Sequence, residues 1–284
     1  PGPRPGVQGP FMQTTTRQGT PATSPAPKKS LGQHFLRNPD ICRRIAALAN
    51  LQDEDLVLEI GPGPGALTKV LETLPHSRLL LLEKDAHWAN VRKTEAEART
   101  EVLCMDALTF RWEELEGPWK IVGNLPYNVA SPLIWDIAAR AKATRRAVFM
   151  IQKEVGERLC ANPGCRDYGA LSVWVQAFWQ ASYDFVVKPG AFTPPPKVDS
   201  AVCSFVPRPT RPDDVQAKRL SRVIKLCFGQ RRKQLGGTLR KAGQTLLLEG
   251  LEERGIAPSA RAEELSVEDY LFLSAFEGRK GAPA

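Results

Sequence analysis

The stretch LVLEIGPGPGALTKVLE, residues 56–72, brings together three signals that decide the fold. Its first five residues form a short apolar run, which predicts a buried strand. Three glycines at alternate positions, Gly61, Gly63 and Gly65, then permit a tight turn and let a ligand approach the backbone just before a helix begins. This turn does not select its ligand. Such loops serve dinucleotides, methyl donors and plain packing, and the motif also matches the dehydrogenase variant G-x-G-x-x-A.

Apolar runs and helical segments alternate along the rest of the chain. Further strands are predicted at residues 78–83, 101–105, 119–123 and 145–152, with a β-rich pair near 183–188 and 200–206. Helices are predicted from the Asn38-Pro39 cap to Ala49, from about Gly65, in the segment ending near Arg99, and from a Ser131-Pro132 cap. Nearly continuous apolar strands separated by helices imply an α/β fold, with a parallel sheet covered on both faces.

Composition divides the chain into three parts. Residues 1–27 are rich in Pro, Gly, Thr and Ser, and we expect a disordered arm or an expression remnant. Residues 28–207 carry the alternating pattern of the α/β domain. Residues 208–284 are helical and basic, and we expect a second, small domain there.

The residue content favours a soluble globular protein, with 42% hydrophobic and 25% charged residues. No apolar run approaches the roughly 18 residues of a membrane span, so no membrane is expected. The six cysteines are scattered without a C-x-x-C pair, and the three histidines lie far apart. This pattern favours reduced thiols in a cytoplasmic protein and predicts no metal site.

The net charge of +8 is concentrated in one segment. Residues 208–241 contain eleven Lys or Arg against only two Asp, so this segment alone carries +9. A solvated helix face is the ordinary interpretation of such a run. The concentration, including Arg231, Arg232 and Lys233, favours a nucleic-acid surface instead.

Polar side chains follow the next predicted strands at the point where each ends. Parallel sheets bind ligands at the carboxyl ends of their strands, so these residues should meet at one edge. Glu83 lies about twenty residues beyond the glycines, where a carboxylate can accept both hydroxyls of a ribose. Asp106 can accept a hydrogen bond from an adenine amino group. A surface glutamate and a helix-cap aspartate are the plainer alternatives.

The fourth strand end carries Asn124-Leu125-Pro126-Tyr127, an amide and an aromatic ring side by side. A purine amino group is a poor nucleophile, because its lone pair is delocalised into the ring. The Asn124 side-chain oxygen and the carbonyl of Leu125 can accept its two N–H bonds and turn the nitrogen toward an electrophile. Tyr127 can stack on a base swung out of its helix, and Pro126 stiffens the loop. These residues predict an adenine-amine methylation site.

The whole pattern resembles the ribosomal RNA adenine dimethyltransferases of the KsgA/RsmA type. The resemblance covers roughly residues 28–270 and rests on KKSLGQHFL, EIGPGPGALT, LLLEKD, MDA, NLPYNVASPL, QKEVGERL, YGALSV, AFTPPPKVDSAV and QRRKQL. It implies a Rossmann-like class I S-adenosylmethionine-dependent methyltransferase with a small helical RNA-docking domain. It also implies dimethylation of two adjacent adenosines near the 3′ end of small-subunit (16S) ribosomal RNA during ribosome assembly, by a cytoplasmic monomer.

The resemblance also implies roles for individual residues. The methyl-donor contacts fall on His34, Leu36, Gly61, Gly63, Gly65, Glu83, Asp106 and Asn124. Members of the family often have Asn where His34 stands, which leaves a backbone contact possible there. The target adenine falls on Asn124, Leu125, Pro126 and Tyr127, with Phe192 as a second aromatic wall. For Phe192, packing in the core is the alternative.

Three other functions remain open at this point. The sister family that dimethylates large-subunit RNA shares the core motifs, although NLPYNVASPL, YGALSV and FTPPPKVDSAV fit the small-subunit group better. A non-catalytic assembly factor on the same fold would not need the intact Asn124–Tyr127 loop and the donor residues. A nicotinamide dehydrogenase would explain the glycines and Glu83 but neither Asp106 nor that loop.

Overall fold

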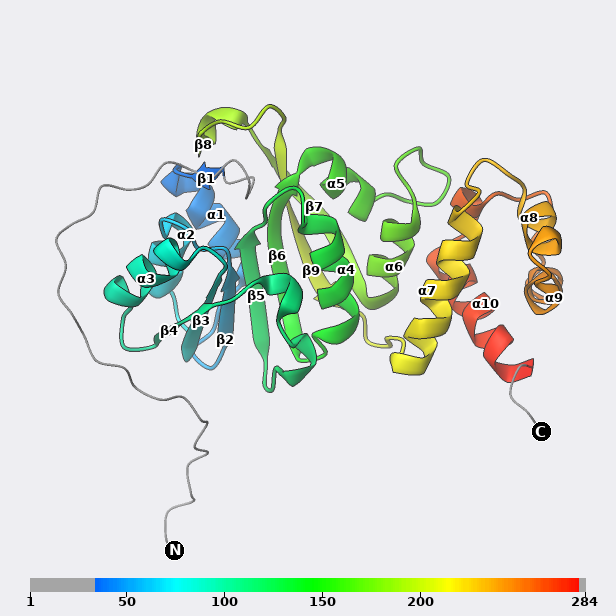
Figure 1. Cartoon of the computed structure of the whole chain (residues 1–284), viewed down its shortest axis with the longest axis horizontal. Helices are drawn as coiled ribbons and strands as arrows, with labels where there is room; N and C mark the ends of the chain where they lie inside the picture. Colours follow the sequence, from blue (N-terminus) through cyan, green and yellow to red (C-terminus); the bar gives the residue numbers. More distant parts are fainter. Residues whose placement is uncertain (1–33, 281–284) are drawn as a thin grey trace, which may run out of the picture.

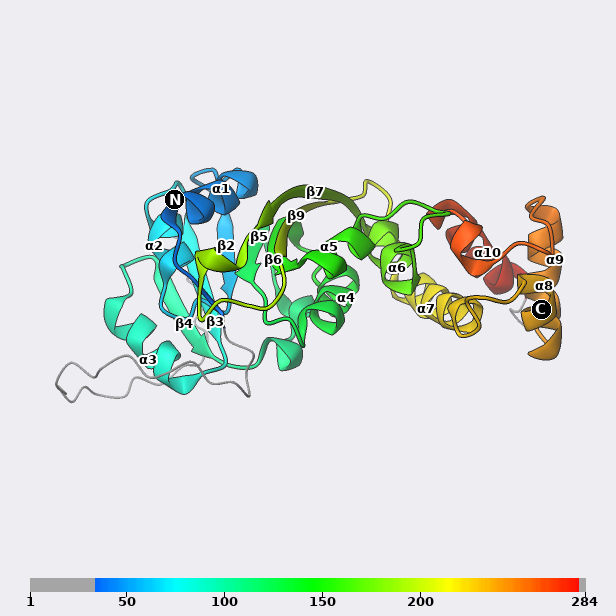
Figure 2. The same cartoon turned by 90° about the horizontal axis from the view of Figure 1, so that it is seen from above.

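The computed structural model describes residues 34–280 (Figure 1). The arm predicted at residues 1–27 lies outside this range. A mixed sheet with helices on both faces forms one end of the molecule, and the C-terminal helices form the other (Figures 1 and 2). The predicted α/β architecture is confirmed.

Seven strands form the main sheet in the spatial order β4-β3-β2-β5-β6-β9-β7. The first five are parallel, and β9 runs antiparallel to both of its neighbours. A second, two-stranded sheet joins β1 (Phe35–Leu36) to β8 (Phe192–Thr193). The strands of the main sheet are β2 (Leu56–Ile60), β3 (Arg78–Glu83), β4 (Thr100–Cys104), β5 (Trp119–Asn124), β6 (Thr144–Gln152), β7 (Trp179–Val187) and β9 (Ser200–Pro207).

Helices follow most strands, as the sequence predicts. They are α1 (Pro39–Ala49), α2 (Ala66–Glu72), α3 (Ala86–Glu95), α4 (Ala130–Arg140), α5 (Lys153–Leu159), α6 (Ala170–Phe178), α7 (Asp214–Phe228), α8 (Leu235–Lys241), α9 (Thr245–Glu253) and α10 (Val267–Lys280). Single 3-10 turns lie at Ala107–Thr109, Trp112–Glu114, Pro189–Ala191 and Ala262–Glu264. None of the helices in the described part of the chain is long and apolar enough to cross a membrane.

Two helix starts show how local chemistry sets the element boundaries. The Asn38 side chain accepts hydrogen bonds from the Asp40 and Ile41 amides, so it caps α1 as predicted. The predicted Ser131-Pro132 cap of α4 is wrong by two residues, because the N-cap is Val129 and the helix begins at Ala130. The carbonyl of Pro126 accepts hydrogen bonds from Val129 and Ala130, which lets the preceding turn continue directly into the helix.

The strands of the sheet bury both faces. Val57 contacts the cluster under α1 and α2, whereas Leu58 and Ile60 contact the larger cluster under α4. Figure 2 shows α1 and α4 on opposite sides of these strands. Alternation along each strand therefore explains why the predicted strands are apolar throughout rather than at every second residue.

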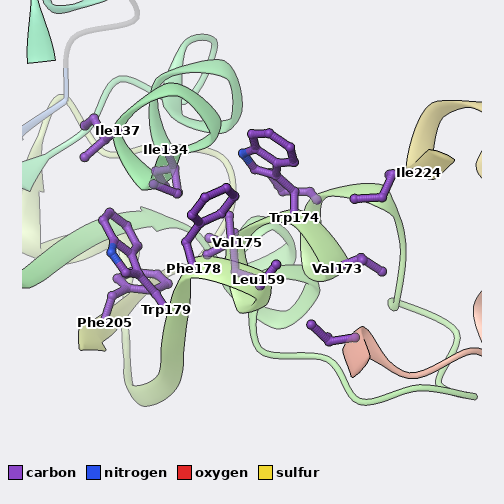
Figure 3. Close-up of a cluster of buried hydrophobic side chains, with 14 of the residues drawn as sticks. Ile134, Ile137, Leu159, Val173, Trp174, Val175, Phe178, Trp179, Phe205 and Ile224 are labelled. Atoms are coloured by element: carbon purple, nitrogen blue, oxygen red, sulfur yellow. The ribbon is translucent and has the colours of Figure 1, made fainter. Parts of the chain in front are cut away.

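Helix α6 connects the sheet to the C-terminal helices. Its Phe178 and Trp174 face the α4 side, while Val173 lies toward Ile224 of α7 (Figure 3). All four side chains belong to one continuous cluster that also contains Phe205 of the sheet. The proposed division between residues 28–207 and 208–284 falls after the last strand, but the core continues across it.

Candidate active site

Two adjoining cavities lie at the carboxyl ends of β2, β3, β4 and β5. The lining of the first includes Met105, Asp106 and Leu108. The second is lined by His34, Phe35 and the loop from Asn124 to Tyr127. Gly61, Glu83 and Pro126 line both cavities. The strand-end residues singled out from the sequence therefore meet at one edge of the sheet.

The glycine-rich turn requires glycine at all three positions. Gly61, Gly63 and Gly65 have φ values of 69°, 50° and 87°, in the left-handed region that other residues rarely adopt. A Cβ on Gly63 would lie 3.0 Å from the ring of Phe35, and one on Gly65 would lie 2.0 Å from the Arg92 guanidinium. Gly61 lines both cavities, and Gly63 lines the second cavity. Gly65 instead packs against Arg92.

Glu83 holds the turn through its carboxylate. One oxygen accepts the Gly63 amide at 3.0 Å and the other accepts the Asp85 amide at 2.8 Å. Burial raises the pKa of Glu83, although these hydrogen bonds oppose the change. A carboxylate has about four acceptor positions, so two backbone bonds leave capacity for two ligand hydroxyls.

Asp106 has one oxygen on the backbone and one on a lysine. Oδ1 accepts the Leu108 amide at 3.0 Å, which is the capping role considered as its alternative. Oδ2 lies 2.7 Å from the Lys84 ammonium. Partial burial would raise the pKa of Asp106, but the hydrogen bonds from Lys84 and Leu108 outweigh it and the pKa is lowered. The side chain is thus an ionised acceptor on the wall of the first cavity.

The orientation of the Asn124 amide follows from a single contact. Nδ2 donates to the backbone carbonyl of His34 at 3.0 Å. A carbonyl can only accept, so the amide nitrogen must face it and Oδ1 must face the other way. Neither this oxygen nor the carbonyl of Leu125 accepts a hydrogen bond from any residue in 34–280. Two adjacent acceptors therefore remain beside the second cavity.

Tyr127 is fixed at its hydroxyl and at its ring. The hydroxyl lies 2.6 Å from the Ser200 hydroxyl, and the ring stacks on His34 with centroids 5.6 Å apart. Burial raises the pKa of Tyr127, so the phenol stays neutral and can donate to Ser200. The sequence reasoning did not single out Ser200 or Phe35. Both stand in motifs, FTPPPKVDSAV and GQHFL, that were used only as a resemblance.

The structure places Phe192, which the resemblance implied as a second aromatic wall, in the core-packed position that was given as its alternative. Phe192 is 4% exposed and packs in the cluster under α1. It pairs with Leu36 across the β1–β8 sheet, and the Leu36 side chain is buried in the same cluster. Neither residue lines the two cavities. His34 and Phe35, which precede Leu36, do line the second cavity, and the His34 carbonyl accepts the Asn124 amide.

The three basic residues predicted to bind RNA lie in the turn between α7 and α8. Arg231 is engaged within the protein. Its Nε lies 2.6 Å from Glu263, and it donates to the carbonyl of Arg166. Arg232 and Lys233 are exposed and form no ion pair with any residue in the described range. The structure thus leaves these two unpaired at the surface, whereas the partly exposed Arg231 is held by Glu263 and Arg166.

Comparisons with known proteins agree with this geometry. A family model described as "Ribosomal RNA adenine dimethylase" matches residues 26–277. A protein of Nitratidesulfovibrio vulgaris named "Ribosomal RNA small subunit methyltransferase A" is 56% identical over 257 residues, which are 88% of this chain and 96% of that protein.

Two solved structures are similar over most of the chain. A dimethyladenosine transferase from Plasmodium falciparum has a TM-score of 0.75 at 26% identity, covering 87% of this chain and 98% of its own. The 23S rRNA methyltransferase ErmE has a TM-score of 0.67 at 25% identity, covering 85% and 98%. The mixed sheet and the helices after it are therefore shared with these two transferases.

Proposed function

The chain belongs to the ribosomal RNA adenine dimethylase family, which makes it an S-adenosylmethionine-dependent adenine methyltransferase, and from this premise we propose its target and the role of each site residue. The proposed reaction is N6,N6-dimethylation of two adjacent adenosines near the 3′ end of small-subunit ribosomal RNA during ribosome assembly. The first cavity takes the methyl donor, and the second takes the target adenine.

The residues of the first cavity fit the donor. Gly61 presents its backbone without a side chain on the wall of this cavity, and Glu83 keeps acceptor positions for the ribose hydroxyls. Asp106 is an ionised acceptor for an adenine amino group. When bound, S-adenosylmethionine supplies an electrophilic methyl group. The lining of Gly61, Glu83 and Pro126 that the two cavities share would put donor and acceptor next to each other.

One observation carries the proposal for the acceptor. The Asn124 amide is oriented by His34, and within the described chain neither its oxygen nor the carbonyl of Leu125, the next residue in the cavity lining, accepts a hydrogen bond. An amine that donates to both has its nitrogen lone pair turned out of the purine plane. Positioning of this kind lowers the barrier by removing the freedom of two bound reactants. A strong general base is unnecessary, because a methylated adeninium amine loses its proton readily.

Methyl transfer from labelled donor to defined RNA tests the target. We expect preferential labelling of purified small subunits that lack adenine dimethylation, over large-subunit RNA and over a short hairpin. A folded substrate is expected because a small basic region needs a shaped RNA to find its register. Equal labelling of the hairpin would remove the requirement for assembled context.

Large-subunit RNA is the second candidate target, because the 23S rRNA methyltransferase ErmE shares the fold over most of both chains. Preferential labelling of that RNA in the same assay would favour it. We also propose that the enzyme acts as a monomer in the cytoplasm. Light scattering of the purified chain tests the first point, and fractionation of cells tests the second.

A further inference from the structure

The second cavity has aromatic lining residues of its own, apart from Phe192, which packs in the core. Aromatic rings that line the second cavity come from His34, Phe35 and Tyr127. The Phe35 ring packs within the protein, because it lies against Gly63 and meets the Trp88 ring edge-on with centroids 5.4 Å apart. His34 and Tyr127 stack on each other, and the His34 carbonyl accepts the Asn124 amide.

Three contacts hold His34 in place. Its carbonyl accepts Asn124 Nδ2, its ring Nδ1 lies 2.9 Å from the carbonyl of Pro194, and its ring stacks on Tyr127 at an interplanar angle of 29°. The next residue begins β1, which pairs with β8 just before Pro194. His34 therefore links the start of the described chain to Pro194, which follows β8, and to the loop from Asn124 to Tyr127.

The spacing of the two rings decides how they can act. A base lying between two rings needs them about 7 Å apart, which is two van der Waals contacts of about 3.5 Å. The His34 and Tyr127 centroids are 5.6 Å apart, so a base does not fit between them. His34 covers one face of Tyr127, and the Ser200 hydroxyl fixes the far end of the phenol.

We propose that the His34 imidazole is a positioning residue that backs the Tyr127 ring and holds its opposite face toward the target adenine. This inference rests on the proposed function and adds a role for the side chain of His34, distinct from any backbone contact with the donor.

The test uses the full-length chain with four variants: His34→Ala, His34→Phe, His34→Asn and Tyr127→Ala. The single-turnover rate of methyl transfer to small subunits lacking dimethylation is measured beside the calorimetric affinity for S-adenosylmethionine. His34→Ala should slow transfer about 2- to 12-fold, the worth of one aromatic pair, with donor affinity unchanged. His34→Phe keeps a ring and should recover most of this loss, whereas His34→Asn keeps a polar group and should not.

A double-mutant cycle separates action through Tyr127 from independent action. If His34 works by holding Tyr127, then adding His34→Ala to Tyr127→Ala should slow transfer little further. The inference would be overturned if the rate losses of the two single variants multiplied in the double variant. It would also be overturned if His34→Ala lost only donor affinity, or if it transferred methyl groups faster than wild type. The last result would identify the ring as an obstacle to the base. Wild-type chain that fails to label small subunits would instead reject the proposed function itself.

Discussion

Asp106 gives its two carboxylate oxygens to different partners, and this division allows a sharp test of the donor site. Asp106→Asn keeps an oxygen for the Leu108 amide and places an N–H donor where we propose that the adenine amino group binds. Two donors would then face each other. An unmet hydrogen bond of this kind costs about 1–3 kcal/mol, so donor affinity should fall roughly 5- to 150-fold by calorimetry.

Lys84→Met is the matched control, because it removes the ion pair with Asp106 but leaves the carboxylate. Its effect should be small, since exposed pairs contribute about 0–1 kcal/mol. Unchanged affinity in Asp106→Asn would reject the assignment of Asp106 to the adenine. Glu83 is a poorer target, because its replacement would also release the amides of Gly63 and Asp85.

Asn124→Ala separates chemistry from RNA binding. The variant should keep most of its affinity for small subunits but lose methyl transfer, because the attacking nitrogen loses one of its two acceptors. Some loss of donor affinity is compatible, since the Asn124 amide also holds the His34 carbonyl. Filter binding and single-turnover labelling measure the two properties. Near-normal turnover would refute the proposed mechanism.

Individual site residues could be predicted from the sequence only where the neighbouring residues along the chain carry the signal. Asn124, Glu83 and Asp106 were found because each follows an apolar strand, and parallel strands bring their ends together. Phe192 could not be judged in the same way. Its burial results from pairing with Leu36, far away in the sequence, and no local pattern records that contact.

At the scale of elements, Glu59 joins β2 to α2 from inside the protein. It is 2% exposed and accepts the Thr68 hydroxyl at 2.7 Å. Burial raises the pKa of Glu59 from 4.5 to about 8, although the Thr68 hydrogen bond and the charge of Arg92 oppose the change. The folded chain therefore keeps a proton that the unfolded chain loses between these two pH values.

The contribution of Glu59 to the free energy of unfolding falls as the pH rises. Because the folded state binds the extra proton, this group's contribution to stability is complete below pH 4.5 and is lost as the pH rises toward about 8. Glu59→Gln has no charge in either state. Its stability relative to wild type should rise with pH over this range, by up to about 1.4 kcal/mol per unit.

Urea unfolding across this pH range measures the difference. The control is Glu97→Gln, which removes a carboxylate from an exposed position. A constant difference between Glu59→Gln and wild type at all pH values would contradict a retained proton on Glu59.

Element boundaries were predictable where one residue controls them, and less so elsewhere. Asn38 caps α1 through its own side chain, so its motif was sufficient. The start of α4 depends on the carbonyl of Pro126, a backbone group present in every residue, so the sequence misplaced it. β1 and β8 were not predicted, because two-residue strands leave no periodicity to detect.

At the scale of the whole molecule, the basic segment is partly neutralised by its own surroundings. Three of the eleven basic residues in 208–241, Arg208, Arg222 and Arg231, pair with Glu268, Glu277 and Glu263. The other eight form no ion pair within the described chain. The charge run was visible in the sequence, but its internal pairs link residues 32 to 60 positions apart and were not.

The last prediction uses this division of the basic residues. Replacing both Arg232 and Lys233 with Ala should weaken binding of undimethylated small subunits and reduce its salt dependence. Each phosphate contact that is lost makes the negative slope of log affinity against log salt shallower by roughly 0.7–0.9. The loss of two contacts is the largest change that this double variant can cause.

Arg231→Ala should instead lower the free energy of unfolding, because it breaks the interactions with Glu263 and Arg166. Binding at several salt concentrations and urea unfolding measure these effects, with donor affinity as the control that neither change should alter. A salt slope that falls only in Arg231→Ala would mean that this arginine leaves Glu263 to bind RNA, and would move the proposed RNA contact from Arg232 and Lys233 to Arg231.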